Sequence, residues 1–179
     1  MKFEEAIKHI EKQVAEMLSS IGEEKIDKII DFFFQANNIF VYGAGRSGLV
    51  GKAFAIRLVH LGFPTFVIGE TITRPVKKGD LVVLISGSGE TIPVAMTAEI
   101  ARRLGAKIIS ITANPDSHIA RFADLVVILK PKEKKADLAP LGTLFESAAW
   151  IFLDGIIAEL MARKGESEES MKRRHATLE

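Results

Sequence analysis

The sequence contains no cysteine, and this absence excludes several kinds of chemistry at once. Without cysteine there can be no disulfide bridge, no thiol nucleophile and no metal site built from thiolates. A chain without cysteine also suits a reducing compartment, so we expect a cytoplasmic protein.

The net charge is small, and long apolar runs are absent from the sequence. The chain has 24 Lys and Arg against 23 Asp and Glu, which predicts no nucleic-acid-binding surface. No apolar run is long enough to span a bilayer, and the charged start MKFEEAIKHIEKQ lacks the pattern of a signal peptide. We therefore expect neither nucleic acid nor a membrane as partner. Lys and Glu are common among the charged residues, which favours a thermophilic source.

The apolar residues make up 47% of the 179 residues and predict one domain with a substantial core. An N-terminal region, residues 1–36, has helical periodicity over 3–18 and 23–35. Short β-branched runs then predict strands at 39–42, 65–68, 81–85, 107–112 and 125–129. Because these runs are continuously apolar and alternate with helical segments, they indicate a doubly wound α/β fold, a three-layer sandwich around a five-stranded parallel sheet.

The end of the predicted α/β core, residues 38–163, is a helix at 144–163 with apolar residues on nearly all faces. Such a helix is expected between subunits or deep in the domain. Together with the aromatic cluster at 32–34, it predicts a homo-oligomer. The polar tail, residues 164–179, is predicted to be mobile.

Two glycine-rich turns follow predicted strands. The first, Gly43-x-Gly45-x-x-Gly48, has the spacing of a dinucleotide-binding turn, and Glu70 follows the second strand where a ribose-binding acid would stand. The second, SGSGET at 86–91, precedes a helix that has Pro93 near its start. Its hydroxyls, glycines and helix-start amides are typical of a phosphate cradle, although N-capping serines in a plain turn would give a similar pattern.

The two turns occupy equivalent positions, at the carboxyl ends of neighbouring strands, where open α/β sheets bind ligands. Ser47 can therefore join the hydroxyls of the second turn around one small anion. This arrangement favours a phosphorylated small molecule over a dinucleotide.

These turns are part of a longer resemblance. SGSGET resembles the phosphate-binding loop of SIS (sugar isomerase) domains, and YGAGRSG, RLVHLGF, PLGTLFE and RHATLE together resemble the 6-phospho-3-hexuloisomerases. The resemblance implies interconversion of D-arabino-hex-3-ulose 6-phosphate and D-fructose 6-phosphate, the isomerase of the ribulose monophosphate pathway. It further implies a carboxylate base acting through an enediol, no metal or other cofactor, and a dimer or tetramer with shared active sites.

The resemblance also assigns the site residues. Glu146, in GTLFE, is the implied base, while the rival interpretation is a capping box formed with Thr143 at the start of the last helix. His175 ranks ahead of His60 as proton relay; His9 is expected on the surface, and His118 in a loop. Arg46 is either a fork-shaped phosphate donor or a solvated loop residue. The predicted substrate-binding set is Gly45, Arg46, Ser47, Ser86, Gly87, Ser88, Gly89, Glu90 and Thr91.

Three other functions stay open. A SIS module that binds a sugar phosphate without converting it would carry the same cradle. An isomerase of another sugar phosphate, such as a pentose or heptose phosphate, is also compatible, because a phosphate cradle does not define chain length. A dinucleotide-binding protein is the third.

Overall fold

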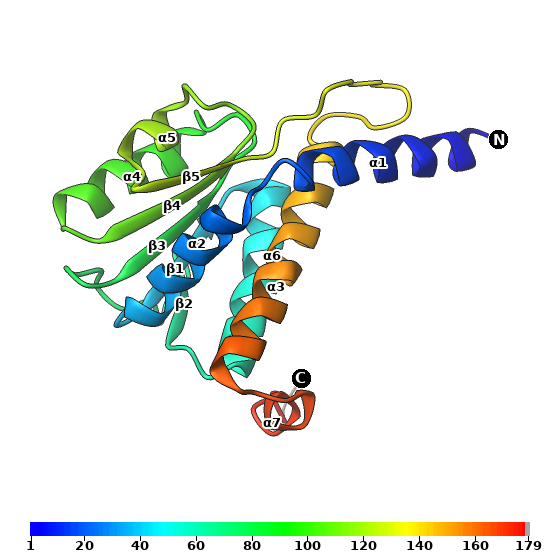
Figure 1. Ribbon diagram of the computed structural model, residues 1–179. Helices are drawn as coiled ribbons and strands as arrows, with labels where there is room; N and C mark the ends of the chain where they lie inside the picture. Colours follow the sequence, from blue (N-terminus) through cyan, green and yellow to red (C-terminus); the bar gives the residue numbers. More distant parts are fainter. Residues whose placement is uncertain (178–179) are drawn as a thin grey trace.

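The protein has three layers, a central parallel sheet with helices on both faces (Figure 1). The computed structural model describes residues 1–177. Its strands are β1 (Ile39–Gly43), β2 (Thr65–Val67), β3 (Leu81–Ile85), β4 (Lys107–Thr112) and β5 (Leu125–Ile128). They lie in the order β2-β1-β3-β4-β5, and every pairing is parallel. The predicted α/β sandwich with five parallel strands is confirmed, each strand lying within one residue of its predicted bounds.

The helices divide between the two faces of the sheet. They are α1 (Lys2–Leu18), α2 (Glu23–Gln35), α3 (Gly45–His60), α4 (Ile92–Arg103), α5 (His118–Phe122), α6 (Thr143–Lys164) and α7 (Glu168–Lys172). One buried cluster joins the sheet to α1, α2, α3 and α6, and a second joins it to α4 and α5. In β3, Leu81, Val83 and Ile85 belong to the first cluster, while Val82 and Leu84 belong to the second. This explains the apolar run, because both faces of the strand are covered.

Helix α6 packs against α1 and α3 with one side and leaves the other in contact with solvent. Ala148, Ala149 and Phe152 are buried, whereas Trp150 is 47% and Ile151 is 53% exposed. The sequence predicted a helix surrounded by protein. Within the described residues of one chain, only part of its circumference is covered.

Helix α1 extends from the body of the molecule as an arm (Figure 1). Its second half is anchored: Val14 and Met17 lie in the core, and the Glu133 N–H donates to Gln13 Oε1 at 2.9 Å. Its first half presents Phe3, which is 69% exposed. His9, expected on the surface, is buried, because it lies one turn before Gln13 on the face of the helix that contacts the loop after β5.

The C-terminal tail, expected to be mobile, forms α7 and contacts α3. The Arg174 guanidinium donates to the His60 carbonyl at 3.0 Å and to both oxygens of the Glu166 carboxylate. Hydrogen bonds from Arg174, Ser170 and Lys164 lower the pKa of Glu166 to about 2. The hydropathy pattern could not predict these contacts, because all the groups are polar. Residues 178 and 179, the end of the RHATLE motif, lie outside the described residues.

Within residues 1–177, no helix has both the length and the apolar composition needed to cross a membrane.

Candidate functional site

The strand order places the two glycine-rich turns side by side. The chain leaves β1 through α3 to the edge strand β2, then returns to β3 on the other side of β1. This reversal is the switch point of a doubly wound sheet, where ligands bind beyond the carboxyl ends of the strands. Gly43 at the end of β1 is in register with Ile85 at the end of β3. The loops that follow them therefore start at one point on the sheet edge.

The glycines of the first turn serve different purposes. A Cβ on Gly43 would lie 2.9 Å from the Ser47 and Ile85 carbonyl oxygens, and a Cβ on Gly48 would lie 2.6 Å from the Gly43 oxygen. These two permit the close approach of β1 and α3. Gly45 has φ +57° and no atom within 4 Å of its Cβ position, so it leaves open space at the start of α3.

The serine loop, residues 86–91, is folded around its own hydroxyls. The Gly89 N–H donates to Ser86 Oγ at 3.1 Å, the Glu90 N–H donates to Ser88 Oγ at 3.2 Å, and Ser86 Oγ lies 3.2 Å from Thr91 Oγ1. Helix α4 follows with Thr91 as its N-cap residue, and no side chain caps it. The serines are therefore not caps of α4. Three hydroxyls are gathered beside a helix N-terminus, two of them held in place by the Gly89 and Glu90 amides. Such a cluster suits an anion.

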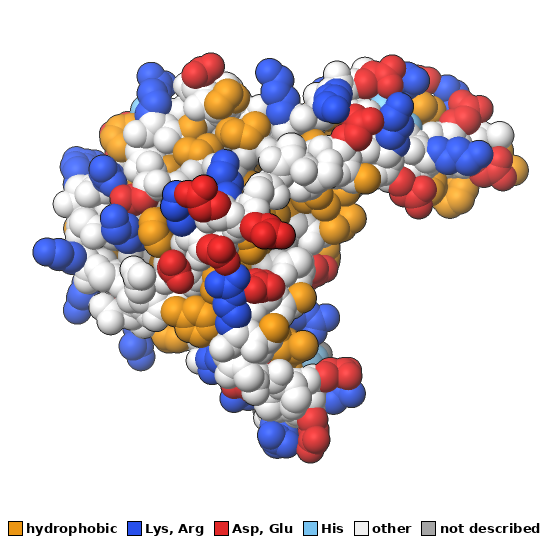
Figure 2. Space-filling model, viewed as in Figure 1, with side chains coloured by type: hydrophobic (Ala, Val, Ile, Leu, Met, Phe, Trp, Pro, Cys, Tyr) orange, Lys and Arg blue, Asp and Glu red, His pale blue; other side chains and the backbone are white. Residues whose placement is uncertain are grey.

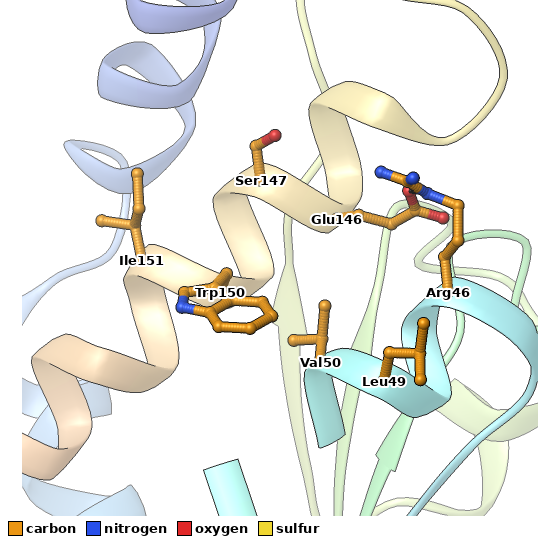
Figure 3. Close-up of a pocket in the computed structure, with 7 residues that line it drawn as sticks. All are labelled: Arg46, Leu49, Val50, Glu146, Ser147, Trp150 and Ile151. Atoms are coloured by element: carbon orange, nitrogen blue, oxygen red, sulfur yellow. Dashed lines mark hydrogen bonds and ion pairs between the residues drawn. The ribbon is translucent and has the colours of Figure 1, made fainter. Parts of the chain in front are cut away.

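Glu146 lies in the first turn of α6 and faces Arg46 from the first turn of α3 (Figure 3). Arg46 Nε donates to Glu146 Oε2 in an ion pair. The Glu146 side chain is 13% exposed, whereas that of Arg46 is 70% exposed. The rival capping box is not formed, because Gly142 is the N-cap residue and the Thr143 hydroxyl donates to the Pro140 carbonyl. The carboxylate is thus held at the ligand edge by a side chain, not by backbone amides.

A cavity of about 360 Å³ opens beside this ion pair, between α3 and α6 (Figure 3). Its polar end carries Arg46, Glu146 and Ser147, and its apolar part is lined by Leu49, Val50, Trp150 and Ile151. The sequence did not single out Ser147 or Trp150. Their signal was their position on the same helix as Glu146, Ser147 directly after it and Trp150 one turn later, which becomes meaningful only when α3 is known to face α6.

Phe145 connects the serine loop to the first turn of α6. A Cβ on Gly87 would lie 3.1 Å from the Phe145 ring, so the loop backbone rests on the residue next to Glu146. The residue before the candidate base is therefore packed against the candidate phosphate cradle.

Glu90 and Glu70, two other acids considered at the sequence level, have partners within the chain. The His118 N–H donates to Glu90 Oε1 at 2.8 Å, and Lys52 Nζ lies 2.6 Å from Glu70 Oε1. Glu90 thus contacts the start of α5, and Glu70 pairs with α3.

The two candidate relay histidines lie at the other end of the sheet. His60 ends α3 and is 5% exposed, and its ring stacks on that of His175 with centroids 4.9 Å apart. Since α3 starts at the ligand edge and rises ~1.5 Å per residue, His60 lies roughly 20 Å from the serine loop of the same chain. His118 starts α5, with Nε2 2.7 Å from Glu99 Oε1.

No group of three or more acidic or histidine side chains within residues 1–177 is placed to hold a metal ion. The expectation of a cofactor-free reaction stays a prediction.

Comparison with known proteins shows to which family the chain belongs. Residues 32–148 match the SIS domain family, and the chain belongs to this family. It is 38% identical to the 3-hexulose-6-phosphate isomerase of Bacillus subtilis, with both chains covered completely. It is 43% identical to the enzyme of that name from Methanocaldococcus jannaschii, over 87% of this chain and 85% of that one. A crystal structure of a Methanococcus jannaschii protein, from which a 3-hexulose-6-phosphate isomerase function has been inferred, has a TM-score of 0.90 and 38% identity, covering 98% and 99% of the two chains. Within the SIS family, the chain belongs with the 3-hexulose-6-phosphate isomerases.

Proposed function

We propose that this protein is a 3-hexulose-6-phosphate isomerase that interconverts D-arabino-hex-3-ulose 6-phosphate and D-fructose 6-phosphate. The chain is 38% and 43% identical to two enzymes of that name, over 85% or more of each chain, and this similarity supports the reaction. The observation that carries the assignment to this site is the placement of Glu146, a nearly buried carboxylate, in the lining of a cavity large enough for a small ligand and next to Phe145, which packs against Gly87 of the serine loop.

The reaction moves a carbonyl group between C2 and C3 and requires one proton to change carbons. Starting from fructose 6-phosphate, Glu146 removes the proton from C3, the electrons of that C–H bond form the C2–C3 double bond of an enediol, and the C2 carbonyl oxygen takes up a proton. The same carboxyl then returns its proton to C2, and the C3 hydroxyl gives up its proton as it becomes the carbonyl. One carboxylate at hydrogen-bond reach of both carbons is sufficient for the transfer between carbons, because no electrons leave the sugar, and the relay histidine serves the transfer between the two oxygens.

The serine loop supplies the binding of the phosphate group in this proposal. Ser86, Ser88 and Thr91 provide hydroxyls, and the N-terminus of α4 follows directly after them. Ser47 and the open space at Gly45 lie across the switch point. The phosphate fixes one end of the open sugar chain, and C2 and C3 then extend towards Glu146.

The active site is completed by a second copy of the chain in this proposal. His60 and His175 lie too far from Glu146 to act on the same sugar within one chain, so a relay histidine would come from a neighbour. The exposed surface supports association: Figure 2 shows apolar side chains in the angle between the α1 arm and the body. Phe3 on the arm and Trp150 and Ile151 on α6 are exposed, and a groove beside them is lined by apolar residues of α2 and α6.

Incubation with carbon-13-labelled fructose 6-phosphate, followed by NMR, tests the reaction. We expect a new signal for a 3-keto sugar phosphate at equilibrium with the 2-keto form. If fructose 6-phosphate is unchanged but raises the melting temperature, the protein is a sugar-phosphate-binding module. If neither occurs, pentose and heptose phosphates should be tried, and NAD in the same melting assay.

Mixing two inactive variants tests the shared site. Glu146→Gln and His175→Ala are unfolded and refolded together, and each alone serves as control. If each active site takes Glu146 from one chain and His175 from its partner, half of the randomly paired dimers are mixed, and each mixed dimer has one intact site. About a quarter of wild-type activity would then return. No recovery in assemblies shown to be mixed would place both residues of one site on the same chain, or show that His175 has no part in the reaction.

A further inference from the structure

Glu90 stands within a loop expected to bind a dianion, which is an unfavourable place for a carboxylate. Two negative charges so close repel each other, so the presence of a carboxylate here indicates another purpose. The side chain is turned to the segment 112–119, from the end of β4 to the first turn of α5, where Oε1 accepts the His118 N–H at 2.8 Å.

The same segment supports the serine loop at further points. The Ile119 N–H donates to the Gly89 carbonyl at 3.2 Å, and the Ala113 N–H donates to the Gly87 carbonyl at 3.0 Å. The Thr112 hydroxyl donates to the Gly87 carbonyl at 3.3 Å. The serine loop is thus held at Gly87, Gly89 and Glu90 by this one segment.

Ser117 fills the space beneath Gly89. Its side chain is fully buried, and its Oγ has no hydrogen-bond partner among the described residues. A Cβ on Gly89 would lie 2.2 Å from that Oγ. The Gly89 backbone therefore lies directly against Ser117, with no room for a side chain between them.

We propose that Glu90 is a positioning residue: its carboxylate fastens the serine loop to the amide of His118, so that the loop hydroxyls are held in place for the phosphate group of the substrate. The inference rests on the proposed function in taking the serine loop as the phosphate site. Glu90 does not touch the sugar. It acts through the backbone conformation of Gly89 (φ +68°) and of its own amide, which donates to Ser88.

The affinity for inorganic phosphate, measured by calorimetry on the whole protein, separates positioning from direct contact. For Glu90→Ala we expect affinities for inorganic phosphate and for fructose 6-phosphate that are weaker by the same factor, about tenfold, the usual effect of losing a hydrogen bond to a charged group. KM should rise by that factor while kcat changes less. Glu90→Gln retains an oxygen acceptor, so it should remain within about threefold of wild type.

Glu99→Gln is the matched control. Glu99 contacts the His118 ring on the side of α4, so the variant removes a negative charge at the same place without touching the serine loop. Its phosphate affinity should equal that of wild type.

Three outcomes would overturn the inference. If Glu90→Ala weakens fructose 6-phosphate but not inorganic phosphate, Glu90 contacts the sugar. If both Glu90 variants bind phosphate more tightly, its charge acts only by repulsion. If wild-type protein binds no phosphate, the loop is not a phosphate site. Because phosphate binding requires no turnover, a protein with a normal phosphate response and no isomerase activity would reject the proposed function and leave the role of Glu90 standing.

Discussion

Replacing Gly89 by Ala tests how closely the serine loop rests on the segment beneath it. Two effects add at this position. The backbone has φ +68°, where an L-residue with a side chain costs about 1 kcal/mol. The new Cβ would also lie 2.2 Å from Ser117 Oγ and 2.4 Å from Ser117 Cβ. Overpacking of this kind costs about 1–3 kcal/mol, so we expect a total of about 2–4 kcal/mol in the free energy of unfolding.

Gly165→Ala provides the comparison, because Gly165 has φ +67° and no atom within 4 Å of its Cβ position. It should lose only the conformational part, about 1 kcal/mol. Both variants are unfolded in guanidinium chloride at one protein concentration, since association would make stability depend on concentration. A double-mutant cycle with Ser117→Gly should recover the steric part of the Gly89→Ala effect, about 1–3 kcal/mol. Equal losses at Gly89 and Gly165, or a coupling near zero, would refute the packing described here.

Three further predictions concern Arg46, the tail and Thr143. Arg46→Met should lower kcat by about tenfold or more while leaving inorganic phosphate affinity unchanged, because the guanidinium contacts Glu146; a weaker phosphate affinity at normal kcat would make Arg46 a phosphate ligand instead. The pKa of Glu166 is lowered to about 2 in the folded protein, so its carboxylate stabilises the tail above about pH 4.5, and this contribution is lost as pH falls from 4.5 towards 2. The stability difference between wild type and Glu166→Gln, followed by denaturation at several pH values, should shrink over that window, and a constant difference would contradict the Arg174 contact. Thr143→Ala should change the free energy of unfolding by less than about 0.5 kcal/mol, because this hydroxyl does not cap α6, whereas a loss near 1 kcal/mol would restore the capping interpretation.

The sequence was sufficient for the sheet because buried parallel strands leave an unambiguous pattern. Leu81–Ile85 is apolar at five consecutive positions, and both faces of β3 are covered. The position of the serine loop at the sheet edge followed from the same alternation of strands and helices. A pattern of apolar residues indicates which positions are buried, and both faces of this sheet are covered by helices. The positions of the strands could therefore be predicted.

The partners of polar side chains could not be read in this way. Arg46 and Glu146 are separated by 100 positions, and their pairing depends on α3 facing α6. Glu90 was grouped with the substrate ligands because it belongs to SGSGET, yet its carboxylate contacts α5. The buried position of His9 and the Arg174–Glu166 contact in the tail likewise depend on tertiary packing. Such contacts leave no periodic pattern in a single sequence, so they could not be predicted from it.

The central claim is that Glu146 transfers the proton between C2 and C3, and the loss of isomerisation in Glu146→Gln tests it most directly. Wild type and variant are compared on carbon-13-labelled fructose 6-phosphate, with calorimetry to verify that both bind it and Glu70→Gln as a control for a carboxylate on the same edge. We predict that Glu146→Gln binds fructose 6-phosphate with near-normal affinity and forms no 3-keto product, while Glu70→Gln converts it like wild type. Conversion at a wild-type rate by Glu146→Gln would contradict the account, because another group would then have to carry the proton.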